Sequence, residues 1–301
     1  MAMRLATYSA GGSPAVGVVL EDGSVLDGAA VLRAGGGDPA PLADMIATIE
    51  AWDRVGPVLA KAAAAPPPGA VVAQERVRLL APIPRPRKNV FCVGRNYLDH
   101  VAEGDRAAGR ETTVPEHAQF FTKPANVVIG PGEWIPNHAA VTKALDYEVE
   151  LVVVIGKGGA DIPRERAFEH VFGYTIGNDI TGRDLQRRHG QWFKGKGLDR
   201  SCPMGPWIVP RGGIAEPPDL RISLTVNGEQ RQDSRTSRMI FDIPAILSVL
   251  SAGLTLEPGD MIMTGTPEGV GYAMTPPRLL KPGDRIAAAI EGIGVLENEV
   301  R

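Results

Sequence analysis

The sequence predicts a strand-rich α+β protein. Short apolar strand signals alternate with turn signals through most of the 301 residues, and only a few segments show the period of a helix. The 36 glycines and 26 prolines favour many short strands and turns over long helices. Because the strands do not alternate regularly with helices, we expect a roll or barrel and not a sheet built from βαβ units.

Two parts of the chain differ in character. In the first part, the Asp22-Gly23 turn predicts a hairpin, and residues 42–64 predict a helix that Pro57 ends or kinks. A proline-rich run follows this helix. We therefore predict a small mixed α/β domain over residues 1–80 and a larger catalytic domain over residues 81–301.

The larger part contains clear turn signals and two short helical segments. Asn227-Gly228 predicts a second hairpin, and Pro258-Gly259 and Pro282-Gly283 each precede an apolar strand. Helices are expected at residues 164–170 and 242–251.

The composition indicates a small-molecule partner. The net charge is −3 and no long basic run is present, which argues against nucleic acid. No apolar run is long enough to span a membrane, and the first residues do not form an export signal. Cys92 and Cys202 lack metal-type spacing, so we expect reduced thiols in a cytoplasmic protein, with Cys92 filling the core.

Carboxylates occur at every second residue in the segment Asp146-Tyr147-Glu148-Val149-Glu150, directly before an apolar run. In a strand, Glu148 and Glu150 would project from the same face. Two buried like charges repel each other, and a divalent cation relieves both the repulsion and the cost of burial. A solvated acidic face on an edge strand is the alternative, and this segment alone does not separate the two.

Asp179 falls where a second apolar strand, residues 173–178, ends. A carboxylate there could complete an oxygen-rich cation site, although Asp also commonly caps a turn. For Arg183 and Asp184, which follow shortly after, we expect a structural pair or cap.

Three further segments carry candidate chemistry. His100 and Glu103 would share one face of a helix, where the carboxylate could orient the imidazole as a general base. One ammonium of Lys194-Gly195-Lys196 could stabilise enolate charge, and the turn at Thr266 could hold a carboxylate. The alternative for His100 and Glu103 is a solvated surface pair. For the lysine segment it is a mobile surface loop, and for the turn at Thr266 it is an ordinary glycine-rich turn.

Together these segments resemble the fumarylacetoacetate hydrolase family, in particular its bacterial acylpyruvase and 2-hydroxyhepta-2,4-diene-1,7-dioate isomerase type. The resemblance runs from about Lys88 to the C-terminus. It rests on the ordered motifs GRNYLDH, FTKPANVVIGPG, LDYEVELVVVIG, GYTIGNDITGRDLQ, FKGKGLDRSCPMGPW and TGTPEGVG.

This resemblance implies a mixed β-sandwich roll, a homodimer and a site for Mg²⁺ or Mn²⁺, with Ca²⁺ as an alternative. The residues that match the family's metal ligands are Glu148, Glu150 and Asp179. The residues that match its catalytic groups are the His100 and Glu103 dyad and Lys196, and those that match its substrate contacts are Gln186 and Thr266.

The family's animal namesake has a further metal-binding aspartate upstream of its histidine. This sequence has no acidic residue at that position, since Asn96 and Asp99 are only nearby. We therefore expect a metal held by three carboxylates and water.

The resemblance implies hydrolysis of a carbon-carbon bond in a β-diketo acid of the acylpyruvate or fumarylpyruvate type, a reaction of aromatic catabolism. His100 and Glu103 would activate water, and Lys196 and the metal would stabilise the departing enolate. A decarboxylase or a hydroxymuconate-type isomerase on the same metal site is the alternative, and a non-catalytic binding protein is a third hypothesis. The dyad favours hydrolysis or decarboxylation, because simple tautomerisation needs no activated water.

The far side of the substrate is expected to face residues 105–115, a charged segment that looks like a mobile lid. Arg95, Arg106 and Arg110 could receive a second carboxylate, which would favour a diacid such as fumarylpyruvate. Solvated surface arginines are the alternative.

Overall fold

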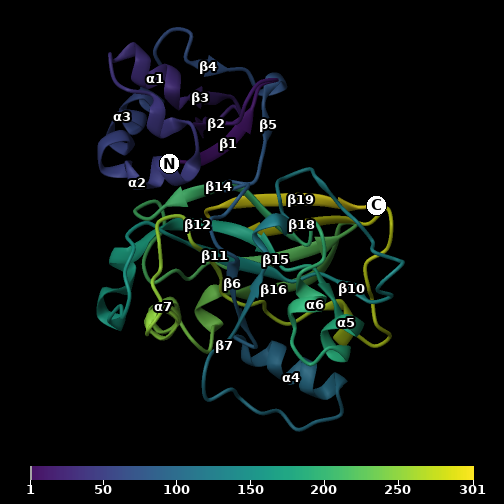
Figure 1. The fold of residues 1–301 in the computed structure, drawn as a ribbon. Coiled ribbons are helices and arrows are strands. Elements are labelled where there is room, and N and C mark those ends of the chain that lie inside the picture. Colours follow the sequence, from purple (N-terminus) through teal and green to yellow (C-terminus); the bar gives the residue numbers. More distant parts are fainter. Residues whose placement is uncertain (1) are drawn as a thin grey trace.

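Two β-sheets packed face to face form the centre of this computed structural model, which describes residues 2–301 (Figure 1). The larger sheet has twelve strands, and the order β4-β3-β2-β1-β14-β12-β11-β17-β6-β7 follows its main path. Its strands are β1 (Leu5–Ser9), β2 (Ala15–Val19), β3 (Val25–Asp27), β4 (Val71–Val72), β5 (Arg78–Leu79), β6 (Val90–Gly94), β7 (Gln119–Lys123), β8 (Val128–Ile129), β11 (Val149–Ile155), β12 (Val171–Asn178), β14 (Cys202–Pro210) and β17 (Met261–Met263).

The smaller sheet has five strands in the order β16-β15-β18-β19-β9, and a separate pair joins β10 to β13. The strands are β9 (Trp134–Ile135), β10 (Leu145–Asp146), β13 (Thr181–Gly182), β15 (Arg221–Val226), β16 (Glu229–Arg235), β18 (Arg285–Ile290) and β19 (Gly294–Val300). This architecture confirms the strand-rich α+β fold.

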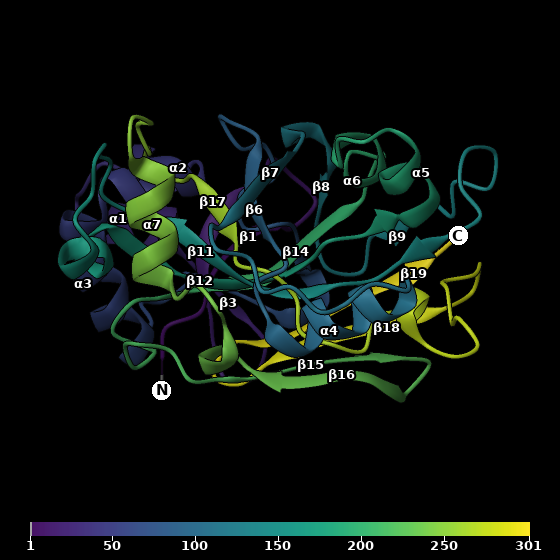
Figure 2. The ribbon, with the colours of Figure 1, turned by 90° about the horizontal axis from the view of Figure 1, so that it is seen from below.

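Helices lie around the sheets and at their ends (Figures 1 and 2). The α-helices are α1 (Gly28–Ala34), α2 (Met45–Glu50), α3 (Trp52–Ala64), α4 (Leu98–Ala107), α5 (Arg183–Arg188), α6 (Phe193–Lys196) and α7 (Ile243–Ser251). The 3₁₀ helices span Ala40–Leu42, Gln74–Arg76, Ala125–Val127, Arg164–His170, Thr236–Arg238 and Gly271–Ala273. In the described residues, no helix is both long and apolar enough to cross a membrane.

Strand β11 lies in the middle of the molecule and is buried on both faces. Leu151 and Val153 point into the core between the two sheets, whereas Val152 and Val154 point into a second core that includes residues of α2 and α3. This burial on both faces explains why the strand is a continuous apolar run. Because side chains alternate along a strand, Glu150 shares the face of Val152 and Val154.

The N-terminal strands continue the large sheet, since β1 pairs antiparallel with β14. A boundary at residue 80 stays a prediction. The expected helix over residues 42–64 is wrong in one respect, because the break falls at Ala51 and α3 continues through Pro57. Ala51 ends α2 and lets α3 start in a new direction, with the ring of Trp52 packed edge-on against Phe172.

The predicted turns and short helices are present. The Asp22-Gly23 turn joins β2 to β3, and Asn227-Gly228 joins β15 to β16. The turns before Met261 and Arg285 each lead into a strand, and α7 begins after Asp242, whose carboxylate accepts a hydrogen bond from the N–H of Ala245. Local turn and capping signals therefore located these elements correctly.

Shortening a side chain of β11 tests the importance of this strand for stability. Leu151 is fully buried between the sheets, so Leu151→Ala should lower the free energy of unfolding by about 2–5 kcal/mol, because it leaves a cavity. Leu98→Ala makes the same chemical change at a side chain that is 49% exposed and should cost about 0.5 kcal/mol or less. Urea unfolding of both variants measures the difference, and equal losses would contradict the assignment.

Candidate metal and active site

The register of β11 and β12 brings three carboxylates together. These strands are antiparallel, and Val149 pairs with Asn178, so the start of β11 lies beside the end of β12. The N–H of Asp179 donates to the carbonyl of Glu148 at 2.8 Å. Carboxylate oxygens of Glu148, Glu150 and Asp179 all lie within 4.8 Å of one another, and all three residues are buried.

Two buried lysines neutralise part of this negative charge. Lys196 Nζ lies 2.5 Å from Glu148 Oε2 and 2.6 Å from Asp179 Oδ2. Lys123 Nζ lies 2.7 Å from the other oxygen of Asp179 and also donates to the carbonyls of Ile180 and Lys196. Sequence reasoning singled out Lys196 but missed Lys123, although a lysine at the end of a strand with no other charged residue was a usable signal.

Arg183 also belongs to this cluster, which corrects the expectation that it pairs with Asp184. Its Nη2 lies 2.7 Å from Glu148 Oε1, and its Nε donates to Asp146 Oδ2 at 2.9 Å. The pairing of β10 with β13 places the start of α5 beside Asp146, which explains this reach. Asp184 instead accepts hydrogen bonds from Thr142 and from backbone N–H groups, as a structural cap does.

The charges within the cluster are unequally compensated. Burial, together with nearby Asp179 and Glu148, raises the pKa of Glu150 well above its usual value. Burial acts in the same direction on Glu148, but Arg183 and Lys196 outweigh it and lower the pKa of that carboxyl. A divalent cation would supply the positive charge that Glu150 lacks, and three carboxylate oxygens suit Mg²⁺, Mn²⁺ or Ca²⁺.

The turn after β17 closes one side of the cluster. The N–H of Gly265 donates to Glu150 Oε2 at 2.6 Å. Gly265 has a φ of 101°, and a Cβ there would lie 2.7 Å from the Cβ of Asn96, so this close approach requires glycine. Thr266 follows Gly265 and lines a pocket next to the cluster. Its hydroxyl accepts a hydrogen bond from Gln232 at 2.8 Å.

His100 and Glu103 lie on α4 and form the close pair that their spacing predicts. His100 Nδ1 lies 2.9 Å from Glu103 Oε1, and the N–H of Gly269 donates to Glu103 Oε2 at 2.9 Å. Because the carboxylate accepts, we assign the proton to Nδ1, which leaves Nε2 as the acceptor of a neutral imidazole. A catalytic role for the pair stays a prediction.

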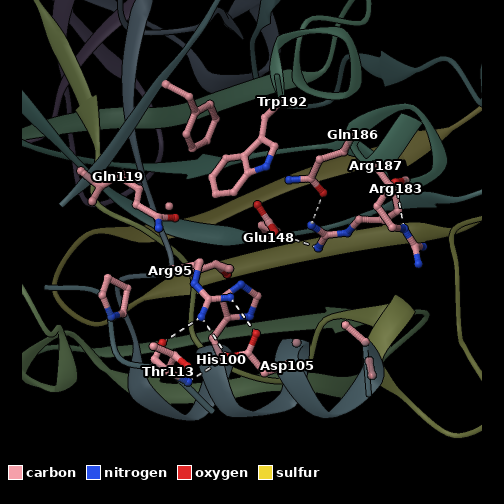
Figure 3. A pocket seen from close by; sticks show the side chains of 18 of the residues that line it. Arg95, His100, Asp105, Thr113, Gln119, Glu148, Arg183, Gln186, Arg187 and Trp192 are labelled. Carbon is pink, nitrogen blue, oxygen red and sulfur yellow. Dashed lines mark hydrogen bonds and ion pairs between the residues drawn. The ribbon is translucent and has the colours of Figure 1, made fainter. Parts of the chain in front are cut away.

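These groups meet in a pocket of about 1020 Å³ (Figure 3). Its wall combines Glu148 and Glu150 of the carboxylate cluster with residues of α4, α5, α6 and the segment after α4, whereas Asp179 and Glu103 lie behind it. The predicted site residues that line it are Arg95, His100, Glu148, Glu150, Gln186, Lys196 and Thr266. The structure therefore gathers in one place residues that lie up to 171 positions apart in the sequence, from Arg95 to Thr266.

Two of the three arginines that were expected to bind a second substrate carboxylate form ion pairs within the protein. Arg95, held at a φ of 55°, binds both oxygens of Asp105 at 3.0 and 2.9 Å, and Arg110 lies 3.2 Å from the same carboxylate. The hydrogen bonds from Arg95 are the main reason why the pKa of Asp105 is lowered to about 2. Arg106 is exposed and is not part of the pocket wall. Asp105 thus fastens the segment after α4, including the N–H of Thr113, to the end of β6.

Comparisons with known proteins agree with this architecture. The family model "Fumarylacetoacetate (FAA) hydrolase C-terminal" matches residues 89–301, which is more than two thirds of the chain. This chain belongs to the fumarylacetoacetate hydrolase family. A relative named oxaloacetate tautomerase YisK, from Bacillus subtilis (strain 168), is 53% identical over 224 residues that cover 74% of this chain and 73% of the relative.

Two solved structures extend the likeness to the whole chain. A fumarylacetoacetate hydrolase from psychrophilic Exiguobacterium antarcticum has a TM-score of 0.81 and 39% identity, with 99% of each chain covered. A 2-hydroxyhepta-2,4-diene-1,7-dioate isomerase from Mycobacterium marinum has a TM-score of 0.72 and 32% identity, with 99% of this chain and 98% of that chain covered. The chain is therefore a fumarylacetoacetate hydrolase family member with that family's fold.

This family member shows no fourth acidic ligand in residues 2–301. Asp99 is exposed and lies 3.5 Å from Arg238 at the surface. The Asn96 amide donates to the carbonyls of Phe241 and Thr264, so it serves to hold the backbone. The acidic cluster accordingly consists of Glu148, Glu150 and Asp179.

Removing the buried guanidinium tests how strongly the cluster depends on it. Arg183→Met should lower the free energy of unfolding by about 3–5 kcal/mol, because it leaves Asp146 and Glu148 buried with less positive charge. Arg187→Met is the matched control on the same helix, since Arg187 is exposed and forms no ion pair among the described residues. Chemical denaturation measures both variants, and a loss below about 1 kcal/mol for Arg183→Met would contradict its structural role.

Proposed function

We propose that this protein is a divalent-metal-dependent enzyme that acts on 2-oxo acids, and that it interconverts the keto and enol forms of an oxaloacetate-like diacid. The observation that carries this proposal is that His100, Lys196, Glu148 and Glu150 line one pocket, with Asp179 directly beside the two glutamates. The 53% identical relative, named an oxaloacetate tautomerase, supports the choice of reaction. A divalent cation held by Glu148, Glu150 and Asp179 would supply positive charge to the 2-oxo and carboxylate oxygens of the substrate.

His100 is the base in this proposal. Its Nε2 takes a proton from C3 of the oxo acid, the electrons of the C3–H bond form the C2–C3 double bond, and those of the carbonyl move onto the C2 oxygen. Glu103 holds the ring through Nδ1 and stabilises the imidazolium that forms. Transfer of the proton to the C2 oxygen yields the enol, and the reverse sequence yields the keto acid.

Lys196 supplies a fixed positive charge beside the reacting atoms. Burial disfavours this charge, but Asp179 and Glu148 outweigh burial and raise the pKa of the ammonium. Lys196 therefore stays protonated at neutral pH and stabilises negative charge as it develops on the C2 oxygen. Because this charge is in place before the reaction, no reorganisation is needed at that moment.

Hydrolysis of a carbon-carbon bond is the second candidate, as the sequence suggested, and the similarity to a solved fumarylacetoacetate hydrolase favours it. In that reaction His100 takes a proton from water, the hydroxide adds to the distal carbonyl, and the bond from that carbonyl to C3 breaks to give the enolate of pyruvate, with its charge on the C2 oxygen. The dyad alone does not distinguish the reactions, since one imidazole can take a proton from carbon or from water. Decarboxylation of an oxaloacetate-like acid also passes through this enolate.

Product analysis with metal-stripped protein tests the proposal. With added Mg²⁺ or Mn²⁺, we expect faster loss of the enol absorbance of oxaloacetate and faster deuterium uptake at its C3 than in buffer with metal alone. Pyruvate and acetate from acetylpyruvate would favour the hydrolase instead, and CO₂ from oxaloacetate would favour a decarboxylase. No acceleration on any of these oxo acids would contradict the proposed function.

Two substitutions separate the base from the metal ligands. His100→Ala should lower kcat by about 10²- to 10⁴-fold while leaving Mn²⁺ affinity unchanged, because His100 does not belong to the acidic cluster. Glu150→Ala should lower kcat and also weaken Mn²⁺ binding. His117→Ala, at an exposed histidine outside the pocket wall, serves as the control. Calorimetric Mn²⁺ titration and initial rates give the two readouts, and full activity of His100→Ala would rule out its role as the base.

A further inference from the structure

Trp192 forms an aromatic wall of the pocket that neither sequence motifs nor the proposed chemistry explains. It directly precedes α6, the helix that carries Lys196, and Figure 3 shows its indole pointing into the pocket toward Glu148. The ring of Phe121 on β7 packs edge-on against it, with centroids 5.3 Å apart and planes at 73°. Lys196 Nζ lies 5.0 Å from the centroid of Phe121. Phe121 therefore packs against the indole and also lies beside the ammonium that would stabilise the enolate.

The position of Trp192 depends on Gly94 at the end of β6. A Cβ on Gly94 would lie 2.2 Å from Cζ3 and 2.7 Å from Cη2 of Trp192, which is closer than atoms can approach. The indole thus rests directly on bare backbone. Gly94 also lines the pocket and directly precedes Arg95, so this contact fixes the ring within the pocket wall.

The polar groups of the pocket are unevenly distributed. Glu148, Glu150 and Lys196 form one group, and Arg95 with Asp105 forms another. In Figure 3, Trp192 lies on one side of Glu148 and Arg95 lies on the other. A substrate whose C2 oxygen lies at Lys196 would therefore have the indole beside it.

We infer that Trp192, seated on Gly94, limits substrate size by closing the side of the pocket next to Glu148 and Lys196. The inference rests on the proposed function and deepens it, because it names the substrate class as short, unbranched 2-oxo acids. An indole both excludes bulk and offers apolar surface to a short chain. Gly94 supports the selection without touching the reacting atoms, so it is a positioning residue.

Substrate competition tests this inference. Trp192→Ala should raise kcat/KM for benzoylpyruvate relative to that for oxaloacetate roughly tenfold, since it opens room for a bulky acyl group. Gly94→Ala keeps the indole but places a Cβ against it, so it should displace the ring and change the same ratio. Phe193→Ala is the control, because the neighbouring ring is 52% exposed and lies outside the pocket wall. If the wild-type protein is active and the ratio of the two kcat/KM values is unchanged in Trp192→Ala, this inference is overturned while the proposed function stands.

Intrinsic fluorescence gives a second readout that does not depend on turnover. The chain has four tryptophans, and of these Trp192 lines the pocket. Oxamate, an unreactive analogue of a 2-oxo acid, should change the fluorescence of wild-type protein with Mg²⁺ but not that of Trp192→Phe, while calorimetry detects binding to both. An equal fluorescence change in both proteins would overturn the placement of Trp192 at the ligand. A wild-type protein that neither binds oxamate nor turns over any oxo acid would overturn the proposed function and this inference together.

Discussion

The burial of three carboxylates at one point is the constraint on which the rest of this structure depends. Charged groups away from water are costly unless they are paired, and like charges make the cost larger. The antiparallel register of β11 and β12 nevertheless places Glu148, Glu150 and Asp179 within 4.8 Å of one another. A fold that accepts this arrangement must bring positive charge from elsewhere, and several of its short elements do so.

Each compensating cation comes from a different element, which ties distant parts of the chain to the site. Lys123 ends β7, Arg183 begins α5 and Lys196 ends α6. Three positive groups face four buried carboxylates, which are Asp146, Glu148, Glu150 and Asp179. The imbalance falls on Glu150, whose close hydrogen bond comes from the neutral N–H of Gly265. The charge that the protein itself does not supply is thus located where a divalent cation would bind.

Local sequence signals predicted much of this structure, but they failed where contacts between distant segments determine the partners of a side chain. Turn residues, capping and strand alternation located the hairpins, α7 and the shared face of Glu148 and Glu150. The spacing of His100 and Glu103 likewise predicted their contact. Arg183 was misassigned because its partners depend on the pairing of β10 with β13, which no local pattern reveals. Trp192 and Gly94 were missed as a pair because they are 98 positions apart in the sequence and meet only in the folded chain.

Most of the pocket wall lies outside the network of buried charges. In the proposed reaction the enolate depends on the cluster, Lys196 and His100, which lie on strand ends and short helices around β11. Tautomerisation, hydrolysis and decarboxylation differ in which bond to C3 breaks. The pocket wall also includes Trp192 and the segment that Asp105 fastens to Arg95. Changes there can alter the reaction without disturbing the buried charges, because none of those residues neutralises a carboxylate of the cluster.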